Sequence, residues 1–225
     1  MSDLFATIPE TTLPSGLVVP EFKLARYLTT VAGGRTAILP DAKPTVNISY
    51  FGAVKAAEAG AMKLITETRH AAVRQILYGI DANWTGGKVG EGNLRQGLRK
   101  WSVRRVQPNN YEPADADEDR RLYLPDGSPI YDFAGHLYTW VRDDVQGDER
   151  GIVAKPFAED SISITAPHPR MTNGMGWYAN PGDDWSGDAL IRGGSWGDGD
   201  DAGVFRLSGA HPEYRGGNVG FRCTL

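Results

Sequence analysis

The sequence predicts one domain of the α+β class, with short strands, two helices and long irregular loops. At 225 residues the chain lies near the upper size for a single domain, and its 40% hydrophobic residues suffice for one sizeable core. Its 28 glycines and 14 prolines are spread along the chain as turn signals, which predicts many short elements. A helical period is present in two segments of the N-terminal third.

The first periodic segment is residues 17–29, in which Phe22 and Leu24 alternate with polar neighbours as in a half-buried strand. We expect this segment to be the opening strand. Residues 1–16 are therefore predicted to form an N-terminal arm, and residues 17–225 the folded domain. The arm could dock to a larger particle or to sister subunits, which leaves a homo-oligomer open.

Two short amphipathic helices follow this strand. The first is predicted to begin after Ser49, whose hydroxyl can cap the helix, and to end at Gly60. The second is capped by Thr66 and ends before Gly79. Beyond Gly79 the helical period is lost, so loops and short strands are expected up to the C-terminus. The buried stripe of the second helix is predicted to be Val73, Ile76 and Leu77.

The charge balance argues against nucleic acid as a partner. The chain has 24 basic and 28 acidic residues, so it lacks the positive field that attracts phosphates or an anionic membrane. The basic stretch 95–105 is predicted to be a solvated face, because acidic residues follow it closely. Residues 115–121 are charge-dense and are predicted to be a solvated loop.

The sequence has no membrane or secretion signal. No run of about 18 apolar residues could span a bilayer, and the first ten residues have neither a basic nor an apolar signal-peptide region. We therefore expect synthesis in the cytosol without a signal peptide, and no membrane insertion. The single cysteine, Cys223, excludes an internal disulfide and a multi-cysteine zinc cluster.

Three sequence blocks occur in a fixed order. The first runs from Pro44-Thr-Val-Asn-Ile-Ser-Tyr to Lys63-Leu-Ile-Thr-Glu-Thr-Arg-His-Ala-Ala-Val-Arg, and the second is Ile130-Tyr-Asp-Phe-Ala-Gly-His-Leu-Tyr-Thr-Trp-Val. The third is Ile191-Arg-Gly-Gly-Ser-Trp, with Asn218-Val-Gly-Phe-Arg-Cys after it. Together they resemble the sulfatase-modifying-factor (formylglycine-generating enzyme) family, a branch of the C-type lectin fold. The resemblance covers about residues 18–225 and implies a C-type-lectin-like fold of the formylglycine-generating-enzyme subclass.

The catalytic chemistry of that family is not expected here. Formylglycine-generating enzymes use two cysteines that bind copper, and the matching places hold about Asp198 and Gly203. The histidine spacing of the iron-binding relatives is also missing, since the four histidines lie far apart in the sequence. We therefore predict no catalytic residue, no metal ligand and no cofactor. A structural calcium stays open, because residues 198–201 offer oxygen ligands, and so does a carboxylate pair for another reaction.

A narrower resemblance covers residues 192–222. The points Arg192-Gly-Gly-Ser-Trp, Ala202-Gly-Val-Phe, Leu207, Pro212 and Gly220-Phe-Arg match the variable proteins of diversity-generating retroelements, in which adenine-directed mutation changes the residues between such points. The resemblance implies a set of shape-holding residues, here called the frame: Gly193, Gly194, Trp196, Val204, Phe205, Pro212, Gly220, Phe221 and Arg222. It also implies a set of ligand-binding residues, here called the contact residues: Gly197, Asp198, Asp200, Asp201, Arg206, Ser208, Ala210, His211, Glu213, Tyr214, Arg215, Gly217 and Asn218.

The residue types at the contact positions agree with this resemblance. Most of them arise from an Asn codon by changes at its adenines, although Glu213 does not. Tyr214 offers contact area at low entropic cost, and Trp177 and Tyr178 are candidates for an adjoining aromatic wall. We predict a non-catalytic receptor-binding protein, encoded by a phage or prophage and incorporated in the particle, whose partner is a cell-surface protein or glycan. The alternative is a degenerate or unrecognised enzyme of the same fold.

Overall fold

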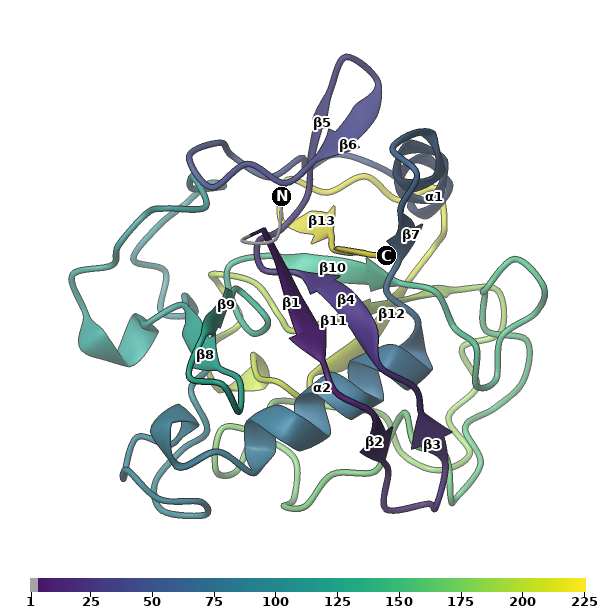
Figure 1. The fold of residues 1–225 in the computed structure, drawn as a ribbon. Helices are drawn as coiled ribbons and strands as arrows, with labels where there is room; N and C mark the ends of the chain where they lie inside the picture. The colour runs from purple at the N-terminus through teal and green to yellow at the C-terminus, as the bar shows by residue number, and fades with distance from the viewer. Residues whose placement is uncertain (1–3) are drawn as a thin grey trace.

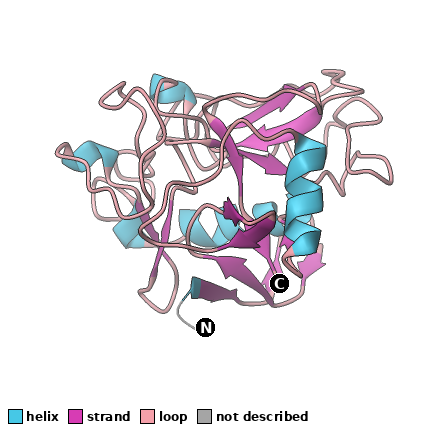
Figure 2. Cartoon of the chain, turned by 90° about the horizontal axis from the view of Figure 1, so that it is seen from above, coloured by secondary structure: helices cyan, strands magenta, loops and turns pink. Residues whose placement is uncertain are grey.

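The computed structural model describes residues 4–225, and residues 1–3 of the predicted arm lie outside this part. It has two α-helices, many short strands and long loops, so the α+β prediction is confirmed (Figure 1, Figure 2). Two four-stranded sheets form its centre, and the remaining strands form two-stranded hairpins. Within residues 4–225, no helix is long and apolar enough to cross a membrane.

The first sheet combines strands from the beginning and the end of the described chain. Its order is β1-β4-β14-β7, and β4 (Phe22–Ala25) pairs antiparallel with both β1 (Phe5–Ile8) and β14 (Cys223–Thr224). β14 also pairs with β7 (Lys63–Leu64). The chain is therefore already part of the domain at Phe5, well ahead of the boundary predicted at residue 17. The side chain of Ile8 is fully buried, which explains why this short segment is part of the domain and not an arm.

The segment predicted as one opening strand is divided in two. β3 (Val18–Val19) pairs with β2 (Thr11–Thr12) in a hairpin, and only β4 belongs to the first sheet. Pro20 stands between β3 and β4. Because proline lacks a backbone N–H and fixes its own φ angle, it interrupts the ladder at this point.

The second sheet has the order β12-β11-β10-β13. β11 (Ala189–Arg192) pairs antiparallel with β10 (Tyr138–Val141) and with β12 (Leu207–Ala210). β13 (Val219–Phe221) runs parallel to β10. The Arg192-Gly-Gly-Ser-Trp motif therefore starts at the end of the central strand β11, and the chain returns on the edge strand β12.

Both predicted helices are present. α1 (Tyr50–Ala59) begins after Ser49, whose hydroxyl accepts a hydrogen bond from the Gly52 N–H. α2 (Glu67–Tyr78) begins after Thr66, whose hydroxyl accepts one from the Arg69 N–H. These side chains satisfy N–H groups that the first turn of a helix leaves without partners. The helices end at Gly60 and Gly79, as predicted.

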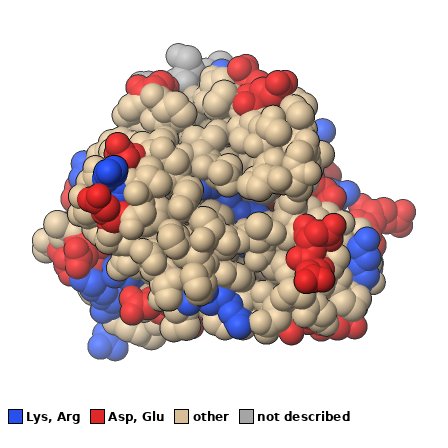
Figure 3. All heavy atoms as spheres, turned by 90° about the horizontal axis from the view of Figure 1, so that it is seen from below, with Lys and Arg blue, Asp and Glu red and all other residues tan. Residues whose placement is uncertain are grey.

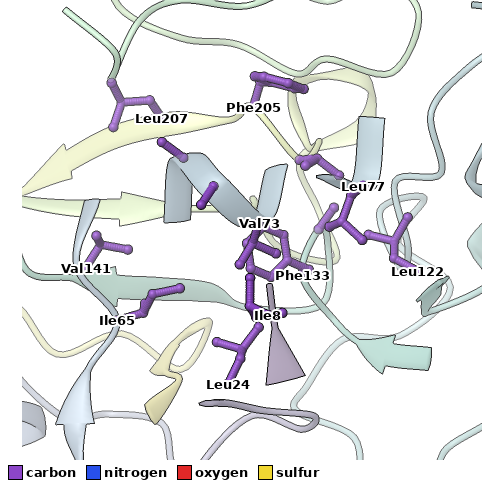
Figure 4. Close-up of a cluster of buried hydrophobic side chains, with 14 of the residues drawn as sticks. Ile8, Leu24, Ile65, Val73, Leu77, Leu122, Phe133, Val141, Phe205 and Leu207 are labelled. Atoms are coloured by element: carbon purple, nitrogen blue, oxygen red, sulfur yellow. The ribbon is translucent and has the colours of Figure 1, made fainter. Parts of the chain in front are cut away.

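The two helices cover opposite faces of the second sheet. α1 packs Tyr50 and Ala53 against Trp140, Ile191 and other residues of one face. α2 lies on the other face, where the larger core joins both sheets (Figure 4). Within the predicted stripe of α2, Val73 and Leu77 are fully buried, while Ile76 is partly exposed at the edge of the core.

The charge-dense residues 115–121 are more than a solvated loop. They contain a 3₁₀ turn, Ala116–Glu118, and the start of β8 (Arg121–Tyr123), which pairs with β9 (Pro129–Tyr131). Two of their charged side chains are buried. The Glu118 carboxylate accepts backbone hydrogen bonds from residues 99 and 100, and Arg120 forms an ion pair with the carboxylate of residue 132. The prediction failed because these partners are distant in sequence.

The remaining hairpin, β5 (Thr30–Ala32) with β6 (Arg35–Ala37), protrudes in Figure 1.

A buried ion network ties α2 to the start of the C-terminal segment. Glu67 has no exposed surface, and its carboxylate accepts hydrogen bonds from Arg74 at 2.9 Å and from Arg192 Nε at 3.0 Å. Arg192 also donates to the carbonyl oxygen of Phe205 at 3.1 Å. The Arg192-Gly-Gly-Ser-Trp motif is thereby fixed to α2.

Candidate ligand-binding surface

Burial divides residues 192–222 into two sets. All the frame residues are buried. The contact residues are exposed or partly exposed, with the single exception of Arg206. The segment thus presents one set of side chains to the core and the other to the solvent. That the second set binds a ligand stays a prediction.

Strand β12 places alternate contact residues on one face. Ala210 packs at the edge of the core beneath α1, whereas Leu207 belongs to the core beneath α2. Because side chains alternate along a strand, Ser208 lies on the same face as Ala210. β12 is an edge strand, so these two residues border the solvent.

The first contact loop, residues 197–201, is held in place by the Asp198 side chain. This side chain accepts a hydrogen bond from the Ser195 N–H at 2.7 Å and another from the Tyr138 hydroxyl at 2.7 Å. The neighbouring Asp200 points away, with a 72% exposed side chain 3.8 Å from the Arg99 guanidinium. The carboxylates therefore have separate partners, and no three His, Cys, Asp or Glu side chains within residues 4–225 are grouped to hold a metal.

Arg206 differs from the other contact residues. Only 9% of its surface is exposed, and its guanidinium carbon lies 5.2 Å from the ring centroid of Trp177 and 5.6 Å from that of Tyr138. The guanidinium donates to the Tyr138 hydroxyl at 2.7 Å. Burial raises the pKa of Tyr138, so this hydroxyl stays protonated at neutral pH and donates to Asp198. Arg206 thus packs beneath the surface, against Trp177 and Tyr138, and supports it.

An aromatic pair borders the edge strand. Trp177 and Trp185 are half-buried and stacked, with ring centroids 6.2 Å apart and an interplanar angle of 11°. A Cβ atom at Gly209 of β12 would lie 3.2 Å from the Trp185 ring. Trp177 was a candidate from the sequence, whereas Trp185 was not, because only the fold brings it beside β12.

The second contact loop, residues 211–218, is anchored at several backbone positions. The Tyr50 N–H donates to the Pro212 carbonyl oxygen at 2.9 Å, and the Asn47 N–H donates to that of Gly216 at 2.9 Å. The Asn218 carbonyl oxygen accepts from β10 at 3.0 Å. The large hydrophobic side chain exposed between these anchors is that of Tyr214, which is 47% exposed. His211, Glu213, Arg215 and Gly217 are exposed as well.

The two places that match the enzyme family's cysteines have other roles here. Asp198 is engaged by Ser195 and Tyr138. At Gly203 any side chain would collide with backbone, because a Cβ atom would lie 2.5 Å from the Gly174 oxygen and 2.6 Å from the Gly176 nitrogen. Gly203 is therefore a packing position.

One neighbour of the contact residues was missed by the sequence analysis. Residues 95–105 were predicted to be a solvated face, yet Arg99 is 9% exposed and lies beside Asp200. Trp101, by contrast, is exposed and contacts Gly197. A tryptophan within a basic, glycine-rich stretch was the available signal, but nothing local assigns it a partner in the C-terminal segment.

A hollow of about 590 Å³ lies on another part of the molecule. Figure 3 shows one face of the molecule, with a depression near its middle and Lys or Arg side chains at the bottom of the depression. The hollow is lined by the 13–15 turn, by α2 and by the 160–167 loop, and Phe205 belongs to its wall. Its basic residue, Arg74, is already paired with Glu67. The contact residues do not line it.

The chain has the C-type-lectin-like fold, as predicted. No family model and no curated protein matches the sequence. Among solved structures, CarF is similar, with 12% identity, a TM-score of 0.51 and coverage of 98% of this chain and 97% of CarF. Treponema denticola variable protein 1 is 13% identical with a TM-score of 0.44, over 98% of this chain and 95% of that one. The Major Tropism Determinant P3c variant is 15% identical with a TM-score of 0.42, over 99% of this chain, which spans 55% of that protein's length.

Proposed function

We propose that this protein binds a receptor without catalysing a reaction, and that its contact residues are diversified by a retroelement while its frame is kept. The observation that carries the proposal is the division by burial within residues 192–222. The frame residues are buried, and twelve of the thirteen contact residues reach the solvent. Such a division lets the contact residues change without opening cavities, since substitutions at exposed positions alter stability little.

The chemistry of the contact residues suits a receptor. Tyr214 offers a large and partly rigid apolar surface, and Arg215 beside it offers charge and hydrogen-bond donors. Their loop is anchored by backbone hydrogen bonds to Asn47, to the first residue of α1 and to β10, so little ordering accompanies binding. The partner is a cell-surface protein or glycan, and the protein is carried on a phage particle.

These residues do not support catalysis by the copper chemistry of the formylglycine-generating enzymes. The one thiol, Cys223, is fully buried, and burial raises its pKa to about 11, so the thiolate that binds copper is disfavoured. The position matched to one enzyme cysteine is occupied by Asp198, whose carboxylate is engaged within the protein. The other position, Gly203, leaves no room for a side chain.

The proposal is tested by a displayed library in which the contact residues other than Arg206 are randomised on the unchanged frame. Lysozyme serves as the probe protein. We expect most clones to fold and some to bind lysozyme specifically. A matched library that randomises the same number of positions, frame residues included, should mostly fail to fold. Equal folding in both libraries, or no binder from a folded contact library, would contradict the proposal.

A further inference from the structure

A segment outside the predicted binding region runs along the first contact loop. The Gly199 N–H donates to the Arg99 carbonyl oxygen at 3.0 Å, and the Trp101 N–H donates to that of Trp196 at 2.8 Å. The Arg99 side chain adds a contact of 3.8 Å to the Asp200 carboxylate. Residues 99–101 are thus fixed to the contact loop by backbone hydrogen bonds that do not depend on which side chains the loop carries.

Trp101 has an unusual conformation for its residue type. Its φ angle is +61°, in the left-handed region that bulky residues rarely adopt, and 58% of its surface is exposed. A large aromatic residue gains little from such a position in a purely structural role, because its apolar surface stays in water. An outlier of this kind points to a function.

The Trp101 ring occupies the space of a side chain at Gly197. A Cβ atom at Gly197 would lie 2.7 Å from Trp101 Cε2, 2.8 Å from Cη2 and closer still to Cζ2. Gly197 is not among the glycines with positive φ, so its backbone accepts any residue. The three heavy atoms nearest to such a Cβ atom all belong to the Trp101 ring. Because the ring is exposed, it moves without disturbing the core.

We infer that Trp101 is a ligand-contacting aromatic residue whose position is set by the residue at 197. With glycine at 197 the ring rests against the loop, and a larger residue displaces it. Diversification at position 197 then moves the large side chain of Trp101 across the surface, although residue 101 itself is not diversified. The inference rests on the proposed function. The matching ligand feature is an apolar side chain on a protein surface, since tryptophan is prominent among residues that dominate protein interfaces.

The contact between Trp101 and Gly197 is tested by fluorine NMR on protein labelled with 5-fluorotryptophan. The chain has six tryptophans, and the Trp101 signal is assigned by its loss in Trp101→Phe. We expect Gly197→Ala to shift this signal and leave the buried Trp84 and Trp140 signals in place. Gly217→Ala is the matched control, because a Cβ atom there meets nothing nearer than 3.9 Å. An unmoved Trp101 signal in Gly197→Ala would overturn the inference.

The role in binding is tested on lysozyme-binding clones from the contact library. We expect Trp101→Ala to weaken binding roughly tenfold or more, as for a residue central to an interface, and Trp101→Phe to retain part of the affinity. Trp101→Asn is the second variant, because asparagine adopts the left-handed conformation readily and keeps the segment folded. Unchanged affinity in both Trp101→Ala and Trp101→Asn overturns the inference and leaves the proposed function standing. A folded library without binders overturns both.

Discussion

Arg206 and Tyr138 form a stacked and hydrogen-bonded pair. The guanidinium carbon lies 5.6 Å from the Tyr138 ring centroid, and Arg206 Nη2 donates to the Tyr138 hydroxyl at 2.7 Å. The same hydroxyl donates to Asp198. Two contact residues from different parts of the segment are therefore joined through one fixed tyrosine, so a change at position 206 also affects the loop that carries Asp198.

Replacement of Arg206 should cost stability. Arg206→Ser removes the cation from between Tyr138 and Trp177 together with its two hydrogen bonds to the Tyr138 hydroxyl, and we expect the free energy of unfolding to fall by about 1–2 kcal/mol. The exposed neighbour Arg215 is the control, and Arg215→Ser should change it by less than about 0.5 kcal/mol. Urea denaturation measures both. Equal effects would mean that Arg206 is an ordinary surface residue.

Replacement of Tyr214 and Arg215 together should separate binding from folding. In a lysozyme-binding clone that retains both residues, we expect the double change to alanine to abolish binding. The free energy of unfolding should stay within about 1 kcal/mol of the parent, because both side chains are exposed. Lys88→Ala, on an exposed loop outside residues 192–222, should leave binding intact. A collapse of the melting temperature in the double variant would identify these residues as part of the core.

Neutralising Glu67 should destabilise the protein strongly. Glu67→Gln leaves the buried cations of Arg74 and Arg192 without their carboxylate, and we expect a loss of about 3–5 kcal/mol in the free energy of unfolding. Glu91→Gln is the matched control, since Glu91 is exposed and lies 3.8 Å from Lys88. Its effect should stay below about 1 kcal/mol. Similar losses in the two variants would contradict the account of the network.

Acid should destabilise the protein in two ranges of pH. Burial, together with the cations of Arg192 and Arg74, holds the pKa of His70 well below its usual range, so stability falls once pH drops below about 6.5, where only the unfolded chain binds a proton. Burial opposes ionisation of Asp132, but Arg120 and His136 outweigh it and keep its pKa below the usual range.

The Asp132 contribution is therefore present above about pH 4 and is lost as pH falls further toward its pKa in the folded protein. Unfolding free energies measured from pH 8 to pH 3 should show both declines. The lower decline should be smaller in Asp132→Asn than in the parent. Asp143→Asn is the comparison, because burial raises the pKa of Asp143 and its contribution has the opposite sign. An identical acid slope in the parent and in Asp132→Asn would contradict the assignment.

The sequence predicts those parts of the fold that depend on neighbouring residues. Ser49 and Thr66 mark the helix starts because a cap acts within its own turn. Strand β1, residues 5–8, was missed because four residues carry little periodicity and its partner β4 is distant in sequence. The buried charges of residues 115–121 were missed for the same reason.

The candidate ligand-binding surface, too, was predictable only where it depends on neighbouring residues. The double glycine at 193 and 194 is informative in sequence, and both residues adopt positive φ angles, which favours glycine. The burial of Arg206 was not predictable, because its aromatic neighbours Tyr138 and Trp177 come from other parts of the chain. Trp101 was missed because its relation to Gly197 exists only in the folded chain.

The most direct test of the diversified surface is the complete DNA sequence of the locus. We predict a near-copy of the codons for residues 192–222 beside a reverse transcriptase gene. The two copies should differ mainly where the template carries adenines, and the affected codons should be those of the contact residues and not of the frame. The template codon for Glu213 should not be an Asn codon. A complete locus without such a copy would contradict diversification by a retroelement.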